Sequence, residues 1–435
     1  MTDHATLTDR LLALWDHLGL TSAHVAVQFA PDMAGFASRH AERIAGLLLC
    51  DSTSTDPAAF VGLAQRLTIV AGDGGVPGKV AAAAVPQLSG CRHVVLAGYA
   101  GPVWADCVTE NRDAVVSALC ELAGDASVPA GAAAEGSHAG ITYRIVGHGP
   151  ALVLFPLFLS AQQWDAAIPA LAERFSVIVL GGRHLGGVAA LESRATSATY
   201  IGMVSSLVQR MAPGPGQSIL EMGCGSGALI RHVARLCGPS HPLTAMDLNP
   251  FLLREAAVLA AEDGVAGQIS FRQGNAEALP FDDASFDHAF SVTVLEECDA
   301  NQALRELCRV VRPGGSVGVI VRAGDMAHPW NIDLPEALLL KVNTRPVMVG
   351  PAGVSDRSLY QRAADAGLRE LACFPMLASV GPEQGVFFRY GESGVLARLS
   401  AEETALWQAA RGVAEAKGIF FSVWPHHCVV GRVPG

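Results

Sequence analysis

Residues 218–233 read SILEMGCGSGALIRHV, a stretch that predicts a short apolar strand, a glycine-rich turn and the start of a helix. In the turn, Gly223, Gly225 and Gly227 admit positive φ angles and let a ligand approach the backbone without meeting a Cβ atom. The predicted helix presents its free N–H groups and the positive end of its dipole to the same point. In a doubly wound sheet this arrangement usually holds an adenosine-type ligand. The turn alone does not decide which adenosine-containing ligand binds.

The strands that follow add a second part to this site. The apolar segment His241–Asp247 ends in an acid and precedes Asn249-Pro250, which opens another helix. A carboxylate at the C-terminal edge of the neighbouring strand is placed to accept both ribose hydroxyls. Further strands are predicted over Ile269–Arg272 and His288–Val292, with Gly274–Glu277 between them.

The order of these motifs resembles that of the class I S-adenosylmethionine-dependent methyltransferases, in the branch related to ubiquinone and menaquinone methyltransferases. The segment Leu304–Val321 (LRELCRVVRPGGSVGVIV) is similar to that family's helix, Arg-Pro-Gly-Gly turn and fifth strand. The resemblance covers about 195–325 and implies a Rossmann-like methyltransferase domain over 195–435, with a substrate pocket built from 325–435. A nicotinamide site is the alternative for the glycine turn taken alone, because Ala228 stands at its third glycine and that fingerprint sometimes tolerates Ala.

The resemblance also implies a role for individual residues, with S-adenosylmethionine as the cofactor. The methionine end of the cofactor would be lined by Glu221, Gly223, Gly225 and Gly227, the ribose held by Asp247, the adenine contacted by Leu248, Asn275 and Ala276, and the sulfonium flanked by Val294 and Glu296. The family commonly has an aspartate where this chain has Asn275, whose side-chain oxygen can still accept from the adenine amino group. The alternative interpretations are a plain helix cap for Asp247 and a solvated surface acid for Glu296.

Methyl transfer from a sulfonium needs alignment and, for a weakly nucleophilic acceptor, a base. The candidate catalytic residues are His328, His426 and His427, with Glu297 as a further candidate. His426 and His427 stand in an apolar run beside Trp424, so a core or turn histidine is the simpler interpretation for each.

Residues 1–125 are predicted to alternate helices and strands, as in a parallel sheet covered on both faces. They resemble the later strands of the α/β-hydrolases, in which a strand runs into a sharp turn that carries the nucleophile. Here Asp32 stands at the nucleophile position, Pro102 stands at the family's histidine, and Asp73 lies early in the acid loop. A triad without its base cannot activate a nucleophile, so we expect a catalytically silent domain.

Residues 126–139 are rich in Ala, Gly and Ser, and they are predicted to be a flexible linker. Residues 140–190 resemble the early strands of the same hydrolase family, although Pro156-Leu157 replaces its His-Gly pair. The two pieces therefore stand in the reverse of the family's order. One interpretation is a circularly permuted sheet that both pieces share, and the other is two remnants that pack separately.

Composition limits the classes of function. The length of 435 residues suits two or three domains, and we expect an α/β protein with two doubly wound sheets. A net charge of −11 argues against a nucleic-acid partner, which would need a basic face. A small-molecule acceptor, an apolar metabolite methylated on O, C or N, is the expected partner, and a homodimer is left open.

No apolar run is long enough for a membrane span, and the N-terminus does not resemble a signal peptide. The 10 cysteines contain no C-x-x-C pair, which predicts reduced thiols in a cytoplasmic protein and no metal site. Two alternative functions stay open at this point: a bifunctional enzyme with an active Asp32 nucleophile, and a cyclase or isomerase that binds the cofactor without moving its methyl group.

Overall fold

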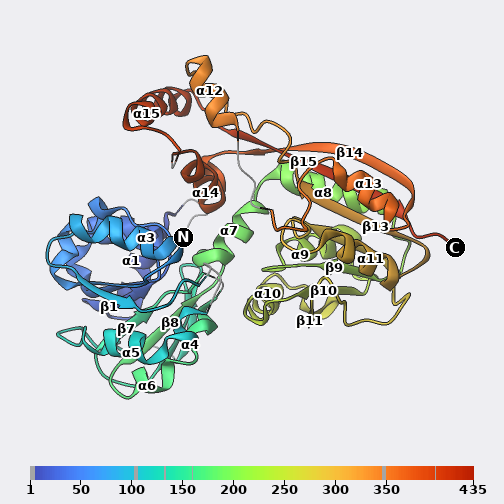
Figure 1. Cartoon of the computed structure of the whole chain (residues 1–435). Helices are drawn as coiled ribbons and strands as arrows, with labels where there is room; N and C mark the ends of the chain where they lie inside the picture. Colours follow the sequence, from blue (N-terminus) through green and yellow to red (C-terminus); the bar gives the residue numbers. More distant parts are fainter. Residues whose placement is uncertain (1–4, 102–105, 132–133, 159, 345–348, 397) are drawn as a thin grey trace. The chain divides into compact units, whose positions relative to one another are not determined.

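The computed structural model describes residues 5–101, 106–131, 134–158, 160–344, 349–396 and 398–435. Contacts divide the chain into two compact units, Met1–Ala189 and Ala190–Gly435. Each unit contains one mixed β-sheet with helices on both faces (Figure 1). The expected fold class, α/β with two sheets, is confirmed.

The sheet of the first unit has eight strands in the order β4-β3-β2-β1-β7-β8-β6-β5. β6 is antiparallel to β5 and β8, and the remaining neighbours pair in parallel. The strands are β1 (Ala23–Val27), β2 (Ile44–Cys50), β3 (Leu67–Gly72), β4 (Arg92–Leu96), β5 (Glu135–His138), β6 (Ile141–Val146), β7 (Ala151–Leu154) and β8 (Ser176–Gly181). The central strands are buried along their whole length, because helices cover both faces.

Two apolar clusters fill the space between this sheet and its helices. One face carries α1 (Leu7–His17), α2 (Pro31–Arg39), α3 (Gly75–Ala84) and a 3-10 segment (Pro57–Arg66). The other carries α4 (Cys107–Glu110), α5 (Arg112–Cys120), α6 (Ile168–Ala172) and a 3-10 segment (Ala161–Trp164).

The two N-terminal segments that resemble hydrolase pieces share this sheet. β1 pairs in parallel with β7, with His24 opposite Leu152 and Ala26 opposite Leu154. When the strands are recounted from β5, their order across the sheet becomes 1-2-4-3-5-6-7-8. The interpretation that the two segments pack separately is therefore wrong.

The segment 126–139 is not a free linker. Ser127 Oγ donates to Ser22 O at 2.8 Å, the Ala130 N–H donates to Leu18 O at 2.9 Å, and β5 occupies the end of the segment. Its small residues indicated flexibility in the sequence, but they also allow close packing: a Cβ on Gly19 would lie 2.7 Å from the Ala130 Cβ. Pro102, the residue at the expected histidine position, lies outside the described residues.

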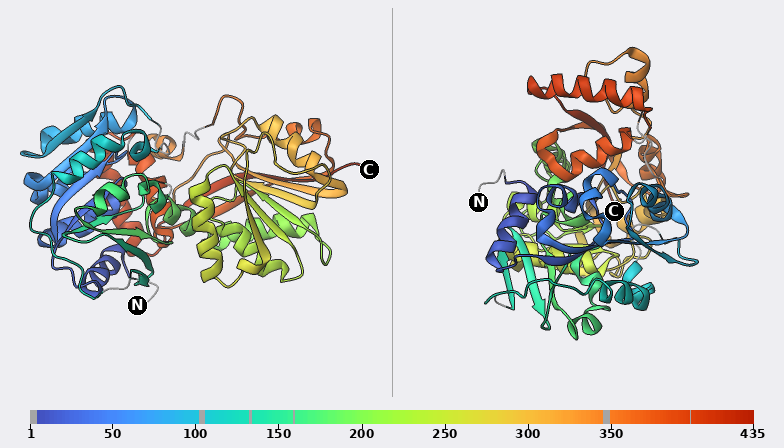
Figure 2. Two further views of the ribbon diagram at one scale, coloured as in Figure 1. Left: turned by 90° about the horizontal axis from the view of Figure 1, so that it is seen from below. Right: turned by 90° about the vertical axis from the view of Figure 1, so that its left-hand side faces the viewer.

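The second unit has a seven-stranded sheet in the order β11-β10-β9-β12-β13-β15-β14, whose strands fan out in the left view of Figure 2. The strands are β9 (Ile219–Met222), β10 (Leu243–Asp247), β11 (Ile269–Gln273), β12 (Phe286–Val292), β13 (Val311–Arg322), β14 (Arg369–Val380) and β15 (Ser422–Arg432). α8 (Ala198–Met211), α9 (Ala228–Cys237) and α10 (Pro250–Glu262) cover one face, and α11 (Ala300–Val310) and α13 (Ser358–Asp365) cover the other. α7 (Gly186–Arg194) runs from the end of the first unit into the second.

The C-terminal region adds strands as well as helices. β15 is antiparallel to both β13 and β14, and α12 (Glu336–Asn343), α14 (Gly385–Leu396) and α15 (Ala401–Ala416) complete the region. β14 was not predicted, because its side chains are mostly exposed or half-buried and give no clear apolar pattern. Ser400 and Glu403 form a capping box at the start of α15.

A stability test follows from the shared sheet of the first unit. Leu152 on β7 and Leu48 on β2 are both fully buried in one apolar cluster. Leu152→Ala and Leu48→Ala should each lower the free energy of unfolding by roughly 2–5 kcal/mol. In urea unfolding followed by tryptophan fluorescence, both should shift the same transition.

The matched control is Leu220→Ala, which opens an equivalent space in a cluster of the second unit. If Leu152→Ala left unchanged the transition that Leu48→Ala shifts, the strands would not share one cooperative core.

Candidate active site

The glycine turn joins β9 to α9 and has the backbone that the sequence predicted. Gly223, Gly225 and Gly227 have φ angles of 79°, 54° and 73°. A Cβ on Gly223 would collide with the Val294 side chain, and one on Gly225 would lie 3.0 Å from Leu191 Cδ1. Both the conformation and the close neighbours therefore require glycine.

Backbone N–H groups of this turn are used by the neighbouring strand. The Gly223 and Cys224 N–H groups donate to Met246 O at 2.7 and 2.9 Å, and the Gly225 N–H donates to Asp247 Oδ2 at 2.8 Å. The turn thus gives a ligand room to approach, while these donors fix the turn to the end of β10.

Asp247 lies where the sequence placed it, at the C-terminal end of β10. Its Oδ2 accepts from Gly225 and its Oδ1 accepts from the Asn249 N–H at 2.9 Å. Burial raises the pKa of the Asp247 carboxyl, and the backbone donors, with Asn249 and Gly225 foremost, oppose this rise. The carboxylate is more than a helix cap, because the cap of α10 is Asn249, whose Oδ1 accepts from the Phe251 N–H at 2.9 Å.

A buried ion-pair cluster contacts the glycine turn at Ser226. Arg231 on α9 is 3% exposed; its Nη1 donates to Ser226 O at 2.7 Å and its Nε donates to Asp263 Oδ2 at 2.9 Å. Glu192, near the end of α7, pairs with the Arg231 guanidinium and accepts from Ser226 Oγ at 2.5 Å. Because these charges are desolvated, removing one partner would leave the other buried and unpaired.

Glu221 ends β9 beside the turn and is 1% exposed. Its Oε2 has no hydrogen-bond partner among the described residues. Burial raises the pKa of Glu221 to about 8, while Arg194 lowers it and Asp247 raises it further. A buried carboxyl with one unpartnered oxygen beside a glycine turn fits the amino group of a bound ligand.

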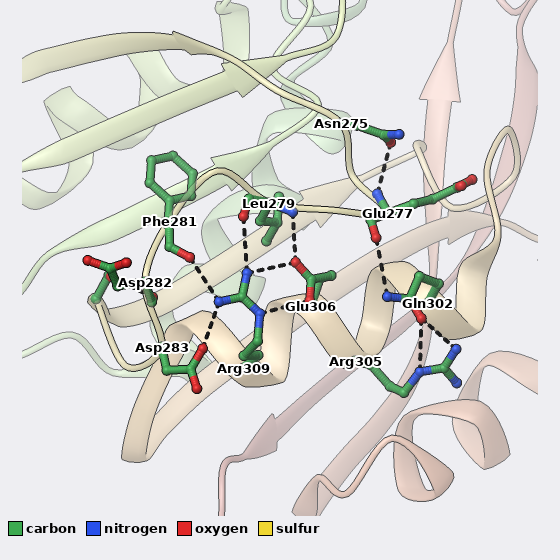
Figure 3. Close-up of polar contacts among 11 residues, drawn as sticks. Asn275, Glu277, Leu279, Phe281, Asp282, Asp283, Gln302, Arg305, Glu306 and Arg309 are labelled. Atoms are coloured by element: carbon green, nitrogen blue, oxygen red, sulfur yellow. Dashed lines mark hydrogen bonds and ion pairs between the residues drawn. The ribbon is translucent and has the colours of Figure 1, made fainter.

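The segment after β11 is held in place by α11. Arg309 donates from Nη1 to Phe281 O at 2.8 Å and from Nη2 to Leu279 O at 3.0 Å, and it pairs with Glu306, whose Oε2 accepts from the Leu279 N–H at 2.7 Å (Figure 3). Within the same segment the Glu277 N–H donates to Asn275 Oδ1 at 2.9 Å.

The three residues expected at the adenine are available to a ligand. Leu248 is 66% exposed, Asn275 is exposed and Ala276 is half-buried. Because the Asn275 oxygen has two lone pairs, the contact with Glu277 leaves one for a ligand amino group.

The end of β12 lies against the turn. The Val294 side chain fills the space beside Gly223. Glu296 is completely buried rather than solvated. Glu296 Oε1 accepts from the Arg322 N–H at 2.8 Å and from Arg322 Nε at 3.2 Å. Thr293, which directly precedes Val294, has a φ of 57°, a strained conformation for a β-branched residue. The interpretation of Glu296 as a surface acid is wrong.

The candidate histidines differ in their surroundings. His426 is buried on β15, its Nδ1 lies 2.9 Å from Trp424 O, and burial lowers its pKa to about 3. Both ring nitrogens of His427 are engaged, Nε2 with Asp325 Oδ1 at 2.7 Å and Nδ1 with Tyr360 Oη at 2.9 Å.

His328 is 3% exposed, and its Nε2 lies 3.2 Å from Ala323 O. The fourth candidate base, Glu297, is exposed.

Two residues near Glu296 escaped the sequence interpretation as site residues. Arg194 at the end of α7 donates from Nη1 to Thr293 Oγ1 at 3.0 Å, and its Cζ lies 5.4 Å from the centre of the Tyr200 ring. Tyr200 on α8 is 1% exposed and belongs to the buried face of that helix. Neither position belongs to a motif, and the strained Thr293 that brings them to the site leaves no signal in the sequence.

Comparisons with known proteins agree with this geometry. Residues 220–319, which run from β9 into β13, match the family model of the methyltransferase domain. The chain carries a methyltransferase domain. S-adenosylmethionine, the cofactor expected from the sequence, is confirmed for this domain.

The chain is similar to a ubiquinone/menaquinone biosynthesis C-methyltransferase from Hahella chejuensis, with 40% identity over 152 residues, 35% of this chain and 59% of that protein. It is also similar to the O-methyltransferase resE from Aspergillus sclerotiorum, with 33% identity over 41% of this chain and 65% of that protein. The chain thus spans less than two thirds of the length of each relative.

Among solved structures, the geranyl diphosphate C-methyltransferase from Streptomyces coelicolor has 16% identity and a TM-score of 0.34, covering 53% of this chain and 78% of that one. No helix among the described residues is long and apolar enough to cross a membrane, and those residues hold no cluster of metal-ligating side chains.

The bridging role of Asp247 gives a binding prediction. Asp247→Ala removes the acceptor of the Gly225 and Asn249 N–H groups and the expected ribose contact. It should weaken S-adenosylmethionine binding in calorimetry at least about tenfold, or about 1.4 kcal/mol. Asp282→Ala, which removes an exposed acid, is the control and should bind as the wild type does.

The raised pKa of Glu221 gives a second prediction. With a pKa of about 8, this carboxyl is mostly protonated at pH 7 in the free protein. A cationic ligand favours the carboxylate, so S-adenosylmethionine should bind with proton release, and affinity should rise as the pH approaches 8. Calorimetry in buffers of different ionisation enthalpy measures this release. Glu221→Gln should reduce it, and heats independent of buffer in the wild type would contradict the assignment.

Proposed function

We propose that the second unit transfers the methyl group of S-adenosylmethionine to a small-molecule acceptor. The observation that carries the proposal is the bridge from Asp247 to the Gly225 and Asn249 N–H groups, next to the unpartnered carboxylate oxygen of Glu221. The family match over residues 220–319 supports it. Under this proposal Glu221 binds the methionine end and Asp247 the ribose.

The remaining cofactor contacts follow from the same arrangement. Leu248, Asn275 and Ala276 form the adenine end, and Arg309 keeps that segment in place. The Val294 side chain occupies the place that a Cβ on Gly223 would take, and so it limits the space at the methionine end. When bound, S-adenosylmethionine supplies an electrophilic methyl group: the acceptor's electron pair forms the new bond, and the bonding pair of the broken C–S bond stays on sulfur. The protein aligns the acceptor and keeps water out.

The acceptor is proposed to be a small, mainly apolar metabolite that is methylated on O, C or N. Aromatic rings dominate the C-terminal region, where Trp330 packs against Trp407 with ring centres 5.0 Å apart and against Phe388 at 5.5 Å. The names of the relatives include both C- and O-methyltransferases, so they leave the acceptor atom open.

For the first unit we propose a circularly permuted, catalytically silent α/β-hydrolase-like sheet. The strand order 1-2-4-3-5-6-7-8, counted from β5, supports the permutation, because the strands of the second segment precede those of the first across the sheet. Asp32 lies in the first turn of α2, is 5% exposed, and accepts from the Gly186 N–H at 3.0 Å through Oδ2. This donor stabilises the carboxylate and reduces its nucleophilicity.

The bifunctional alternative makes a distinct prediction. If the protein hydrolysed a member of an ester or epoxide panel steadily and the Asp32→Asn variant did not, the bifunctional alternative would be supported. The cyclase or isomerase alternative would show cofactor binding without any methylated product.

The proposal is tested with S-adenosylmethionine that carries a deuterated methyl group and a panel of phenols, enols, carboxylic acids and amines. Mass spectrometry should show one labelled methyl group on at least one class of acceptor and S-adenosylhomocysteine in equal amount. Asp247→Ala should reduce both products together at subsaturating cofactor, whereas Asp282→Ala should not. Absence of cofactor binding by the wild type would overturn the proposal. Binding without any labelled product would favour the non-methylating alternative.

A further inference from the structure

Unpartnered polar atoms gather at the end of β12, next to the proposed methionine end of the cofactor. Tyr200 Oη, Glu296 Oε2 and Arg194 Nε are buried and have no hydrogen-bond partner of normal geometry among the described residues. The Tyr200 side chain is 1% exposed and the Glu296 side chain 0%. Since buried polar groups are nearly always hydrogen-bonded, these three atoms indicate a missing ligand.

The three side chains reach this place from separate elements. The Arg194 guanidinium lies 5.4 Å from the centre of the Tyr200 ring and is bonded to the Thr293 hydroxyl. Thr293 holds its strained backbone three residues before Glu296. Backbone strain of this kind persists where the surroundings enforce it, and it is concentrated at ligand sites.

The charges around these atoms favour an anionic oxygen. The guanidinium of Arg322 pairs with the buried carboxyl of Glu296, and that of Arg194 lies beside the Tyr200 ring; burial raises the pKa of Glu296 and Arg322 lowers it. His426 packs edge-on against Tyr200 with ring centres 5.7 Å apart, and it stays neutral because burial lowers its pKa to about 3. The Glu296 carboxylate balances one of the two guanidinium charges, so the group can hold one further negative charge.

Two further ionisable side chains lie near the group. Glu221 has its raised pKa on the cofactor side, and His328 is close enough to influence His426.

We propose that Tyr200, Arg194 and Glu296 form the subsite for an acidic hydroxyl of the acceptor, a phenol or an enol that is bound as its oxyanion. This inference rests on the proposed methyl-transfer function and narrows its acceptor class. Glu296 Oε2 takes the proton, the O–H bond breaks, and its electron pair stays on the acceptor oxygen. The Tyr200 hydroxyl and Arg194 Nε–H donate to that oxyanion. Burial favours the neutral Glu296 that results, and Arg322 keeps its charge beside the site.

The test uses the full chain saturated with S-adenosylhomocysteine and two probes, 4-nitrophenol and its methyl ether 4-nitroanisole. At a pH below the solution pKa of nitrophenol, the absorbance of the nitrophenolate should appear on binding. Nitroanisole, which has no proton to give, should bind at least about tenfold more weakly, because the buried polar atoms would stay unpaired. Equal binding of the two probes, or no binding of nitrophenol, would overturn the proposal.

Variants separate this role from a structural one. Glu296→Gln and Tyr200→Phe should each reduce the bound nitrophenolate signal at least about tenfold while retaining affinity for S-adenosylhomocysteine. Asp282→Asn makes the same change from acid to amide at an exposed residue and should bind nitrophenolate as the wild type does. If both buried variants held the phenolate normally, the subsite would be wrong even though the cofactor still binds. Loss of cofactor binding by the wild type would instead count against the proposed function.

Discussion

The carboxylate of Asp247 joins the glycine turn after β9 to the start of α10, the two parts of the proposed cofactor site. One oxygen receives the N–H of the glycine turn after β9, and the other receives the N–H that precedes α10. Burial of this carboxyl is unfavourable, and the charge-assisted bonds from fixed amides offset that cost. Because Met246 O also accepts from the Gly223 and Cys224 N–H groups of the turn, the position of β10 determines the shape of the turn.

The site beyond the turn depends on that shape. Gly223 is in contact with Val294, so any displacement of the turn reaches the end of β12, where Thr293 holds a strained conformation and Glu296 is buried. Arg194 and Tyr200 reach the same place from helices outside the matched family segment. The proposed cofactor end thus lies within the matched segment, whereas the proposed acceptor end also uses residues outside it.

The sequence predicted what local backbone chemistry determines. Positive φ at Gly223 and the acid at the end of β10 could be read directly, because each is required within a few residues of a strand end. The parallel pairing of β1 with β7 was one of two open interpretations, since pairing across more than 100 residues has no local signal. β14 was missed because its exposed side chains show no apolar alternation. The convergence of Tyr200 and Glu296 could not be predicted, because it depends on tertiary packing.

Arg309 positions the segment around Leu279 and Phe281, and it also limits the motion of that segment. Its guanidinium donates hydrogen bonds to the carbonyl groups of Leu279 and Phe281, while Glu306 accepts one from the Leu279 N–H (Figure 3). A segment without regular secondary structure normally opens readily and exchanges its amide hydrogens fast. Here the Leu279 N–H donates to Glu306 on α11, so we expect this amide to exchange slowly for an irregular segment. The hydrogen bonds to α11 would hold the proposed adenine end in place before a cofactor arrives, and less conformational entropy would then be lost on binding.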